Sequence, residues 1–483
     1  MNRTRLIALV VLSLLIAPGF GQAGLDLPAS VDRGKQLLAE GDKLADQNEP
    51  TEAVLRYKQA FEQLLPGLRK LGFKTEVKRD VTAREDLKGL LLKEIDEELT
   101  PQEFKTSELG MKALGFIPRE LNWKEVMVRV YSEEIAAFYD PKTKTMHLIK
   151  EAPVAEEKKK KKGFLEQLLG GKKEGFDKDE NKTVIAHELT HALSDQNYDL
   201  DKMQKAVEAD DDRSLALSSL IEGEATLAML GAGMDDWDGS KVGAIPSGDL
   251  DRSFSLMMPF MSFAGGASLR EAPVILSESL IFPYLRGLVF CASLTNKGGW
   301  QAINQAYQAP PQSTEQILHP EKYLDQPDPP TTVDLGKLEP GEGWAEVGRN
   351  VVGEMQLGVL LRKHGGKRTA AGWDGDRFAV FEKSDGKLGV AWLSTWDTED
   401  DARDFARQYT RFQTTKLGEG VEQPEVFPDA FRRTAAASGA VHAVERRGND
   451  VAVVEGFNPE ATERLLEAAF RATKREMEPI TRK

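Results

Sequence analysis

The sequence predicts an α+β protein: a mostly helical part that contains a small edge β-hairpin, followed by a separate α+β domain. Three observations predict this class. Segments with helical periodicity dominate up to residue 324, one short hairpin pattern interrupts them, and alternating strand patterns follow residue 343. Between the two parts, "DQPDPPTTVDLGKLEPGEG" (325–343) is rich in proline, glycine and acid, which predicts a linker. We therefore expect domains at 75–324 and 344–483.

The composition is that of a soluble globular chain. Of its 483 residues, 40% are hydrophobic and 29% are charged, and the formal net charge is -14. This acidic balance gives no basic footprint for nucleic acid, so we expect no nucleic-acid partner. Cys291 is the only cysteine, lies in an apolar run, and is expected to be a buried, inert side chain.

Residues 1–23 have the pattern of a secretory signal peptide. Arg3 and Arg5 precede an apolar stretch at 6–16, and a Pro-Gly break leads to a small-residue ending at Ala23. The alternative, an uncleaved membrane anchor, requires a longer apolar span of roughly 20 residues. We expect export to the periplasm or the extracellular space, without stable membrane insertion of the mature chain.

Residues 30–73 predict a hairpin of two helices. Gly41, Ala53, Tyr57 and Ala60 fall at the small and aromatic packing positions of a tetratricopeptide repeat, and the hairpin resembles one such repeat. A single repeat cannot bury its own apolar face. We therefore expect it to pack on the following domain.

The region from 75 to 150 is expected to be mostly helical until "FYDPKTKTMHLI" (138–149), which predicts a β-hairpin. The charged, glycine-rich stretch 156–180 then predicts a surface insertion. Further helices are expected over 214–234 and 275–308. In the C-terminal domain we expect a helix near 344–364, strands "RFAVFEK" and "LGVAWLSTW", the helix "TEDDARDFARQYTRF", the hairpin "AVHAVERRGNDVAVVEGF" and a final helix "PEATERLLEAAFRATKREM".

The stretch "VIAHELTHALSDQ" (184–196) carries the most specific chemical pattern in the chain. At about 100° of rotation per helical residue, His187 and His191 lie within about 40° of each other on one face. Two imidazoles one turn apart can bind one zinc ion, and Glu188 stands where it could accept a proton from zinc-bound water. The alternative is two histidines on a solvated helix face. The uncharged residues around them argue against it.

A zinc hydrolase needs a third protein ligand and an open fourth position. The downstream helix "SLIEGEAT" offers two glutamates, Glu222 and Glu224, which lie about 200° apart, so only one of them can face the metal. The apolar stripe of this helix includes Glu224. Because a buried glutamate needs a partner, the stripe favours Glu224 as the ligand.

"VIAHELTHALSDQ" resembles the active-site helix of thermolysin-type and related glu-zincin metallopeptidases, a resemblance that covers about 140–230. "LIEGEA" is similar to the Leu-x-Glu-Gly-x-Ala stretch of the aminopeptidase branch, in which the glutamate before glycine binds zinc. The resemblance therefore implies that His187, His191 and Glu222 bind Zn²⁺ and that Glu188 is the general base. We give it more weight than the stripe.

The chain departs from these families in two places. The gap between His191 and Glu222 is longer, and Thr226 replaces the aspartate that orients a histidine in thermolysin-type enzymes. Zincins also hold extended substrate along an edge strand, and the hairpin at 138–149 is either such an edge or a plain structural hairpin.

A metallopeptidase also needs a donor for the oxyanion of the tetrahedral intermediate. The candidates are Tyr198, Tyr284, His319 and Tyr323, of which we predict His319. The sequence thus predicts an exported zinc metallopeptidase that acts on a peptide or protein. Two alternatives stay open: a non-catalytic envelope protein that binds partners through its helical hairpin and C-terminal domain, and a zinc hydrolase with non-peptide substrates.

Overall fold

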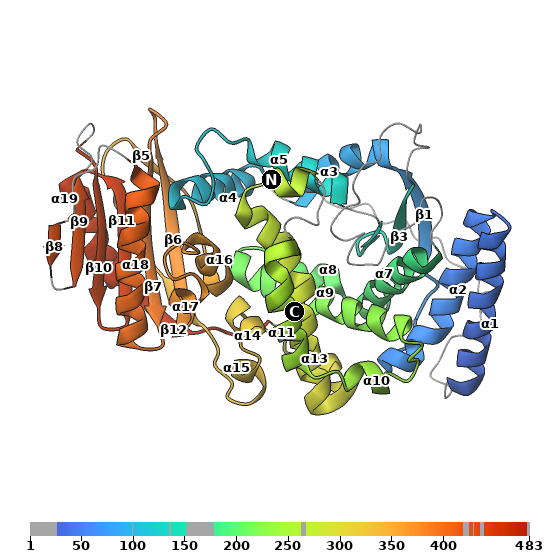
Figure 1. Cartoon of the computed structure of the whole chain (residues 1–483). Helices are drawn as coiled ribbons and strands as arrows, with labels where there is room; N and C mark the ends of the chain where they lie inside the picture. Colours follow the sequence, from blue (N-terminus) through green and yellow to red (C-terminus); the bar gives the residue numbers. More distant parts are fainter. Residues whose placement is uncertain are drawn as a thin grey trace, which may run out of the picture.

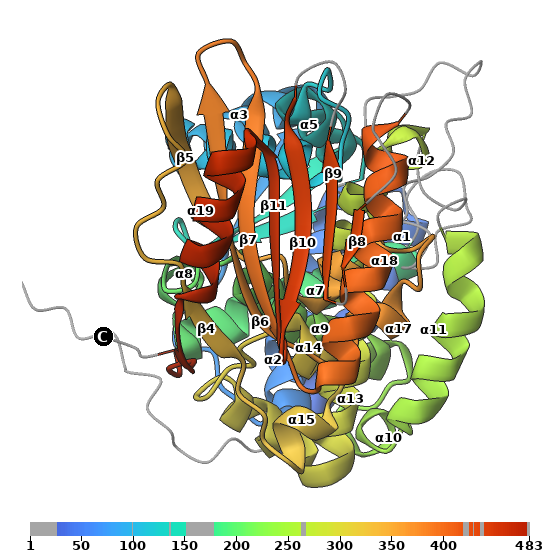
Figure 2. The same ribbon diagram turned by 90° about the vertical axis from the view of Figure 1, so that its left-hand side faces the viewer.

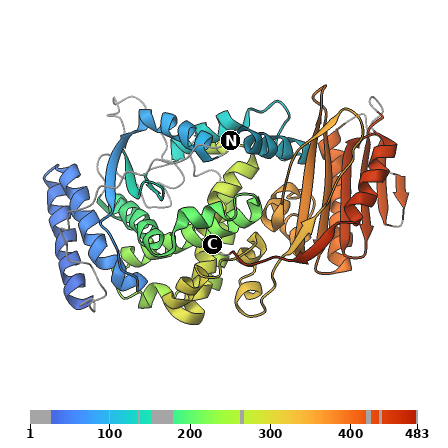
Figure 3. The same cartoon turned by 180° about the vertical axis from the view of Figure 1, so that it is seen from behind.

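The computed structural model describes residues 27–98, 100–134, 137–150, 178–261, 267–418, 425–427, 429–434 and 439–480. It is an α+β structure, as the sequence predicts. Figure 1 shows a helical hairpin at one end, a helical middle part, and an antiparallel sheet at the other end; Figure 3 shows the same order from behind. The expected signal peptide (1–23) lies outside the described residues. So does most of the expected insertion, whose last residues, 178–180, begin a helix.

The N-terminal part consists of helices and one three-stranded sheet of order β1-β3-β2. Its helices are α1 (Leu27–Asp46), α2 (Pro50–Arg69), α3 (Arg84–Glu98), α4 (Pro101–Leu114), α5 (Trp123–Glu134), α7 (Lys178–Tyr198), α8 (Leu200–Lys205), α9 (Asp211–Gly233), α10 (Ser240–Gly243), α11 (Ser247–Met261), α12 (Ala267–Glu271), α13 (Val274–Ala306), α14 (Thr314–Leu318) and α15 (Glu321–Leu324). Its strands are β1 (Lys78–Ala83), β2 (Ala137–Asp140) and β3 (Thr145–Lys150). The β2–β3 hairpin was expected, whereas β1 was not, because its polar sequence KRDVTA carries little strand signal and it pairs in parallel with the distant β3.

The two helices expected between residues 30 and 73 are α1 and α2, and α2 packs against α7. Within the hairpin, Gly41 lies against the ring of Tyr57, where a Cβ atom would not fit. Phe61 and Leu64 of α2 share a core with Ile185 of α7. The hairpin therefore covers the back of the helix that carries the two histidines.

Helices α9 and α13 cross at the centre of the N-terminal part, and they cross at a pair of glycines. A Cβ atom on Gly223 would lie 2.7 Å from the Cα of Gly287 and closer still to its carbonyl group. Both helices are long and apolar enough to span a membrane, but 72% and 61% of their most apolar windows are buried in the structure, which is the pattern of core helices. Cys291 of α13 is fully buried, as predicted.

The C-terminal domain is a seven-stranded antiparallel sheet with helices on both faces, seen toward one face in Figure 2. In sheet order its strands are β5 (Trp344–Asn350), β6 (Trp373–Lys383), β7 (Leu388–Trp396), β11 (Asp450–Phe457), β10 (Val441–Arg447), β9 (Ala430–Thr434) and β8 (Glu425–Phe427). Its helices are α16 (Gly353–Leu360), α17 (Lys367–Ala370), α18 (Glu399–Leu417) and α19 (Pro459–Phe470). A separate two-stranded ribbon pairs β4 (Thr331–Asp334) with β12 (Thr473–Glu476).

Alternate side chains along the central strands enter two different cores, because successive residues of a strand point to opposite faces. Val390 and Trp392 of β7 pack with α18, α16 and α4, whereas Ala391 and Leu393 pack with α19 and β4. Every residue of β7 is buried. This double burial explains why "LGVAWLSTW" is apolar almost throughout.

Three expectations for this half of the chain were wrong in detail. The helix expected near 344–364 is strand β5 followed by the short helix α16, separated at Gly353, whose φ of 75° favours glycine. The expected linker 325–343 contains β4 and buries Val333, which packs on the main sheet. The expected final helix ends at Phe470, and β12 then pairs with β4.

The last described residues return to the N-terminal part. The amide of Met477 donates to the carbonyl of Pro330 at 2.8 Å, and the carbonyl of Glu478 accepts from Arg213 of α9 at 2.6 Å. Ile480 is buried in the core formed by α9 and α13. The end of the chain therefore ties the two halves together.

Candidate metal centre

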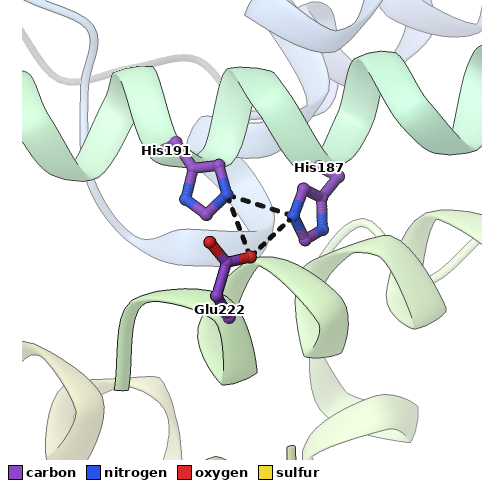
Figure 4. A group of neighbouring side chains, drawn as sticks. All are labelled: His187, His191 and Glu222. Atoms are coloured by element: carbon purple, nitrogen blue, oxygen red, sulfur yellow. Dashed lines mark hydrogen bonds and ion pairs between the residues drawn. The ribbon is translucent and has the colours of Figure 1, made fainter. Parts of the chain in front are cut away.

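Helices α7 and α9 bring His187, His191 and Glu222 together (Figure 4). The two Nε2 atoms are 3.0 Å apart, and Oε2 of Glu222 lies 3.1 Å from Nε2 of His187 and 3.4 Å from that of His191. One ligand atom from each side chain lies within 4.8 Å of the others. The residues for which the sequence predicted zinc binding thus form one group.

The packing of α7 fixes the direction of the histidines. Ile185, Leu189 and Leu193 are fully buried in the core shared with the α1–α2 hairpin. With this stripe turned toward α2, His187 and His191 face α9, and their residues are only 7% and 9% exposed. The solvated helix face considered as an alternative does not exist in this structure.

Burial and the neighbouring charges shift the pKa values of Glu222 and His191 in opposite directions, and the charges prevail. Burial would raise the pKa of Glu222, but the positive charge on His191 and hydrogen bonds from both imidazoles outweigh it and lower that pKa. Burial would lower the pKa of His191, but the Glu222 carboxylate outweighs it and raises that pKa to about 9. The cluster thus pairs an anion with imidazole nitrogens, the donor types that Zn²⁺ prefers.

Glu188 lies beside this group and touches the edge strand β2. It is 7% exposed, and burial raises the pKa of its carboxyl group, against the opposing charges of the two histidines. Its carboxylate accepts a hydrogen bond from the backbone amide of Tyr139 in β2. β2 is an outer strand of its sheet, so no described strand pairs with its second edge, and the Tyr139 amide in β2 lies next to Glu188.

Asp195, one turn after His191, locks the β2–β3 hairpin onto α7. Its buried carboxylate accepts from the hydroxyl of Tyr139 at 2.7 Å and from Nζ of Lys144 at 2.8 Å. The amide of Leu200 donates to the same carboxylate at 3.1 Å. Sequence reasoning missed this contact, because the hairpin residues Tyr139 and Lys144 lie more than 50 residues before Asp195.

Tyr284 of α13 is the tyrosine that lies at the group. Its ring stacks on His187 with 5.9 Å between centroids, and its hydroxyl is hydrogen-bonded to Glu222. Burial, together with the nearby Glu222 and Glu188 carboxylates, raises its pKa well above the usual value, so it remains a hydroxyl donor at neutral pH. It stands one turn before Gly287, where α13 crosses α9.

Glu224 has a different environment. It is 1% exposed and forms a buried ion pair with Arg69 of α2. It also accepts from the hydroxyl of Ser194 at 2.7 Å and from the hydroxyl of Tyr307. The apolar stripe therefore identified a buried glutamate with a partner, but that partner is a guanidinium group and not a metal site.

Thr226 stands where the resembled enzymes have an aspartate that orients a zinc-binding histidine. Thr226 is buried, and its Oγ1 has no hydrogen-bond partner among the described residues; the same holds for the buried Nδ1 of His187. No described side chain therefore fixes the orientation of the His187 ring from behind, in contrast to the carboxylate that the sequence resemblance implies.

The structure places His319, the predicted oxyanion donor, elsewhere. It ends α14, and its Nε2 lies 3.0 Å from Oε1 of Glu354 in α16, a buried carboxylate that needs a partner. The hydroxyl of Tyr323 donates to the carbonyl of Ala309, and Tyr198 stacks on Tyr307. Of the four candidate oxyanion donors, only Tyr284 contacts the histidine–glutamate group in the described part of the chain.

A second group of carboxylates, Glu315, Asp328 and Asp397, also has the spacing of a metal site. Here the ammonium group of a lysine takes the place of a metal ion: Nζ of Lys322 lies 2.7, 3.0 and 2.6 Å from the carboxylates of Glu315, Asp328 and Asp397, respectively. Because Lys322 belongs to α15 and Asp397 follows β7, this lysine joins the two halves of the chain.

Comparison with known proteins gives one match. The profile of a family described as a domain of unknown function (DUF8575) matches residues 341–466, which span β5 to most of α19. No curated protein and no solved structure matches the chain. The match covers the C-terminal sheet and leaves the histidine–glutamate group outside.

Proposed function

We propose that the protein is an exported zinc-dependent metallopeptidase. The observation that carries the proposal is the convergence of one donor atom each from His187, His191 and Glu222 within 4.8 Å. Two imidazoles and one carboxylate are the protein ligands of catalytic zinc sites in which a fourth position stays open for water. Export is proposed from the N-terminal sequence pattern alone.

The donor set fits zinc chemically, and the neighbouring residues fit hydrolysis. Zinc, when bound, lowers the pKa of a bound water toward neutrality and polarises the carbonyl that is attacked. Glu188 is the general base: its raised pKa brings it closer to the operating pH of a proton shuttle. Tyr284, with its hydroxyl already at Glu222, is the donor for the developing oxyanion. It replaces His319 in this role.

The proposed substrate is an extended peptide. β2 is an outer strand of its sheet, and the amide of Tyr139 in this strand already donates to the Glu188 carboxylate. A peptide that pairs with an exposed strand edge is held by its main chain, which places its carbonyl groups beside the strand. Asp195 keeps this edge in a fixed position relative to α7.

The test is zinc content and peptide hydrolysis of the purified mature chain, compared with three variants. His187→Ala is expected to lose the metal, and Glu188→Gln to keep about one zinc per chain while activity on a fluorogenic peptide library falls by roughly 10²- to 10⁴-fold. His364→Ala is the matched control, because this histidine lies in the C-terminal domain near Thr415. It is expected to change neither quantity.

The outcomes separate the alternatives. Zinc lost in His187→Ala, without any hydrolysis that Glu188→Gln reduces, would favour the non-catalytic envelope protein. Hydrolysis of esters but not of peptides, again abolished in Glu188→Gln, would favour a hydrolase with non-peptide substrates. A wild-type chain that binds no zinc when zinc is supplied would refute the proposal.

A further inference from the structure

A cavity of about 240 Å³ lies where the helical part meets the C-terminal domain. Four elements contribute to it: the start of α9, the β4 and β12 ribbon, the end of β5 and the start of β6. The lining residues are Asp210, Arg213, Thr331, Thr332, Val333, Val351, Trp373, Asp376, Arg377, Arg475, Met477 and Glu478.

Three arginines line this cavity, and their hydrogen-bonding capacity is largely unused. Nε of Arg213 is buried without a partner, although its Nη2 is held by Gln312 and the carbonyl of Glu478. The side chains of the half-buried Arg377 and the exposed Arg475 make neither a hydrogen bond nor an ion pair with the described residues. Since buried polar groups are almost always satisfied, the unpaired Nε of Arg213, with two more guanidinium groups in the same wall, points to a missing anionic partner.

The acidic residues in the same wall, Asp210, Asp376 and Glu478, form no ion pair with these arginines in the described part of the chain. The Asp376 carboxylate is occupied by two backbone amides, of Val352 and Gly353, and by the indoles of Trp373 and Trp392. Asp210 caps α9 by accepting from the amide of Arg213. Burial raises the pKa of Asp210, against the hydrogen bond from the Arg213 amide and the charges of Arg377 and Arg213.

We propose that this cavity binds a small oxyanion, a phosphate or a carboxylate compound, through Arg213, Arg377 and Arg475. Planar guanidinium groups bind such anions through paired hydrogen bonds, which makes arginine the residue best suited to them. The hydroxyl-bearing Thr331 and Thr332 supply further donors, and the apolar side chains in the wall limit the room left for solvent.

The position of the cavity gives the anion a role in joining the two halves. Arg213 belongs to α9, Arg377 to β6 and Arg475 to β12, so one ligand would contact both parts of the chain. Glu222 lies nine residues after Arg213 on the same helix, about 14 Å along its axis. The site is thus separate from the histidine–glutamate group, and its existence does not depend on the proposed peptidase activity.

The test is isothermal titration calorimetry of the full mature chain in chloride buffer, with inorganic phosphate and succinate as separate probes at matched ionic strength. We expect saturable binding of at least one probe with a dissociation constant below about 1 mM. Tighter phosphate binding would indicate a compact oxyanion, and tighter succinate binding a dicarboxylate. Binding of neither probe at 10 mM, a concentration at least about ten times the expected constant, would overturn the proposal.

Variants decide whether the binding occurs in the cavity. Arg475→Gln and Arg377→Gln are each expected to weaken it by about tenfold or more, because each removes charged hydrogen bonds. Arg475 is exposed on β12, so its variant is expected to keep the wild-type melting temperature in chloride buffer. The control is Arg471→Gln, which removes the same charge outside the cavity. Equal weakening in the control and in the cavity variants would overturn the proposal.

Discussion

The crossing of α9 and α13 at Gly223 and Gly287 predicts that alanine at Gly223 destabilises the protein, although the same substitution inside a helix usually stabilises it. Replacing glycine by alanine inside a helix normally stabilises a protein by about 0.5–1 kcal/mol. At Gly223 the new Cβ would lie 2.7 Å from the Cα of Gly287. Carbon atoms pack best at about 3.5–4.0 Å, so the two helices would have to separate by roughly 1 Å. We therefore expect Gly223→Ala to destabilise the protein by about 1–3 kcal/mol, the usual cost of overpacking.

The same displacement would reach the candidate metal centre. Glu222 adjoins Gly223 on α9, and Tyr284 lies one turn before Gly287 on α13, so moving the helices apart weakens the contact between them. Alongside the loss of stability, we expect weaker zinc binding and slower hydrolysis. The assays are thermal unfolding followed by circular dichroism, and zinc content after dialysis.

Gly89→Ala is the matched control, because a Cβ at this position of α3 meets nothing within 4 Å. It is expected to leave stability unchanged or to raise it by up to about 1 kcal/mol. If Gly223→Ala melted at or above the wild-type temperature with its zinc retained, the close crossing would not constrain the site, and the reasoning would be refuted.

Three further predictions concern stability. Arg69→Met leaves Glu224 without its charged partner and should cost about 3–5 kcal/mol in thermal melts, while the double variant with Glu224→Gln should recover part of that loss; equal melting of the two variants would contradict this. Burial raises the pKa of Asp211 to about 6, above the usual 3.8 that it has in the unfolded chain. The stability that the protonated carboxyl group contributes is therefore fully present below pH 4 and is lost as the pH rises through 6. The free energy of unfolding of Asp211→Asn should therefore rise relative to that of wild type between pH 4 and pH 7. A difference that stays constant over this range would argue against this. Removal of zinc by a chelator should lower the free energy of unfolding of wild type, but not of His191→Ala, by up to about 4 kcal/mol where free zinc had been 1,000 times its dissociation constant; thermal melts with and without chelator measure this.

The sequence predicted those features that depend on neighbouring residues. His187 and His191 share one helical turn, so their common face followed from helix geometry, and the structure adds what lies opposite. The choice between Glu222 and Glu224 could not be made from periodicity, because both glutamates are partly or fully buried. What separates them is Arg69, which lies 155 residues before Glu224 and whose guanidinium group satisfies it.

Features that depend on distant pairing were missed. Strand β1 carries a polar sequence and exists because β3 offers it an edge, while Trp344–Asn350 has an apolar spacing compatible with a helix and pairs with β6 instead. His319 was chosen as a donor for its chemistry, but a buried carboxylate on α16 takes up its ring nitrogen. In each case a contact between remote segments outweighed the local preference.

The return of the chain end to the helical part has a consequence for the order in which the protein folds. Ile480 completes the core around α9 and α13, and residues 473–476 complete the ribbon that begins at Thr331. Neither can form until residues up to 480 have been synthesised, so α9, which carries Glu222, gains these neighbours after the helices that precede it in the chain. Shortening the chain before residue 473 should therefore affect the stability of the helical part, far away in sequence from the cut.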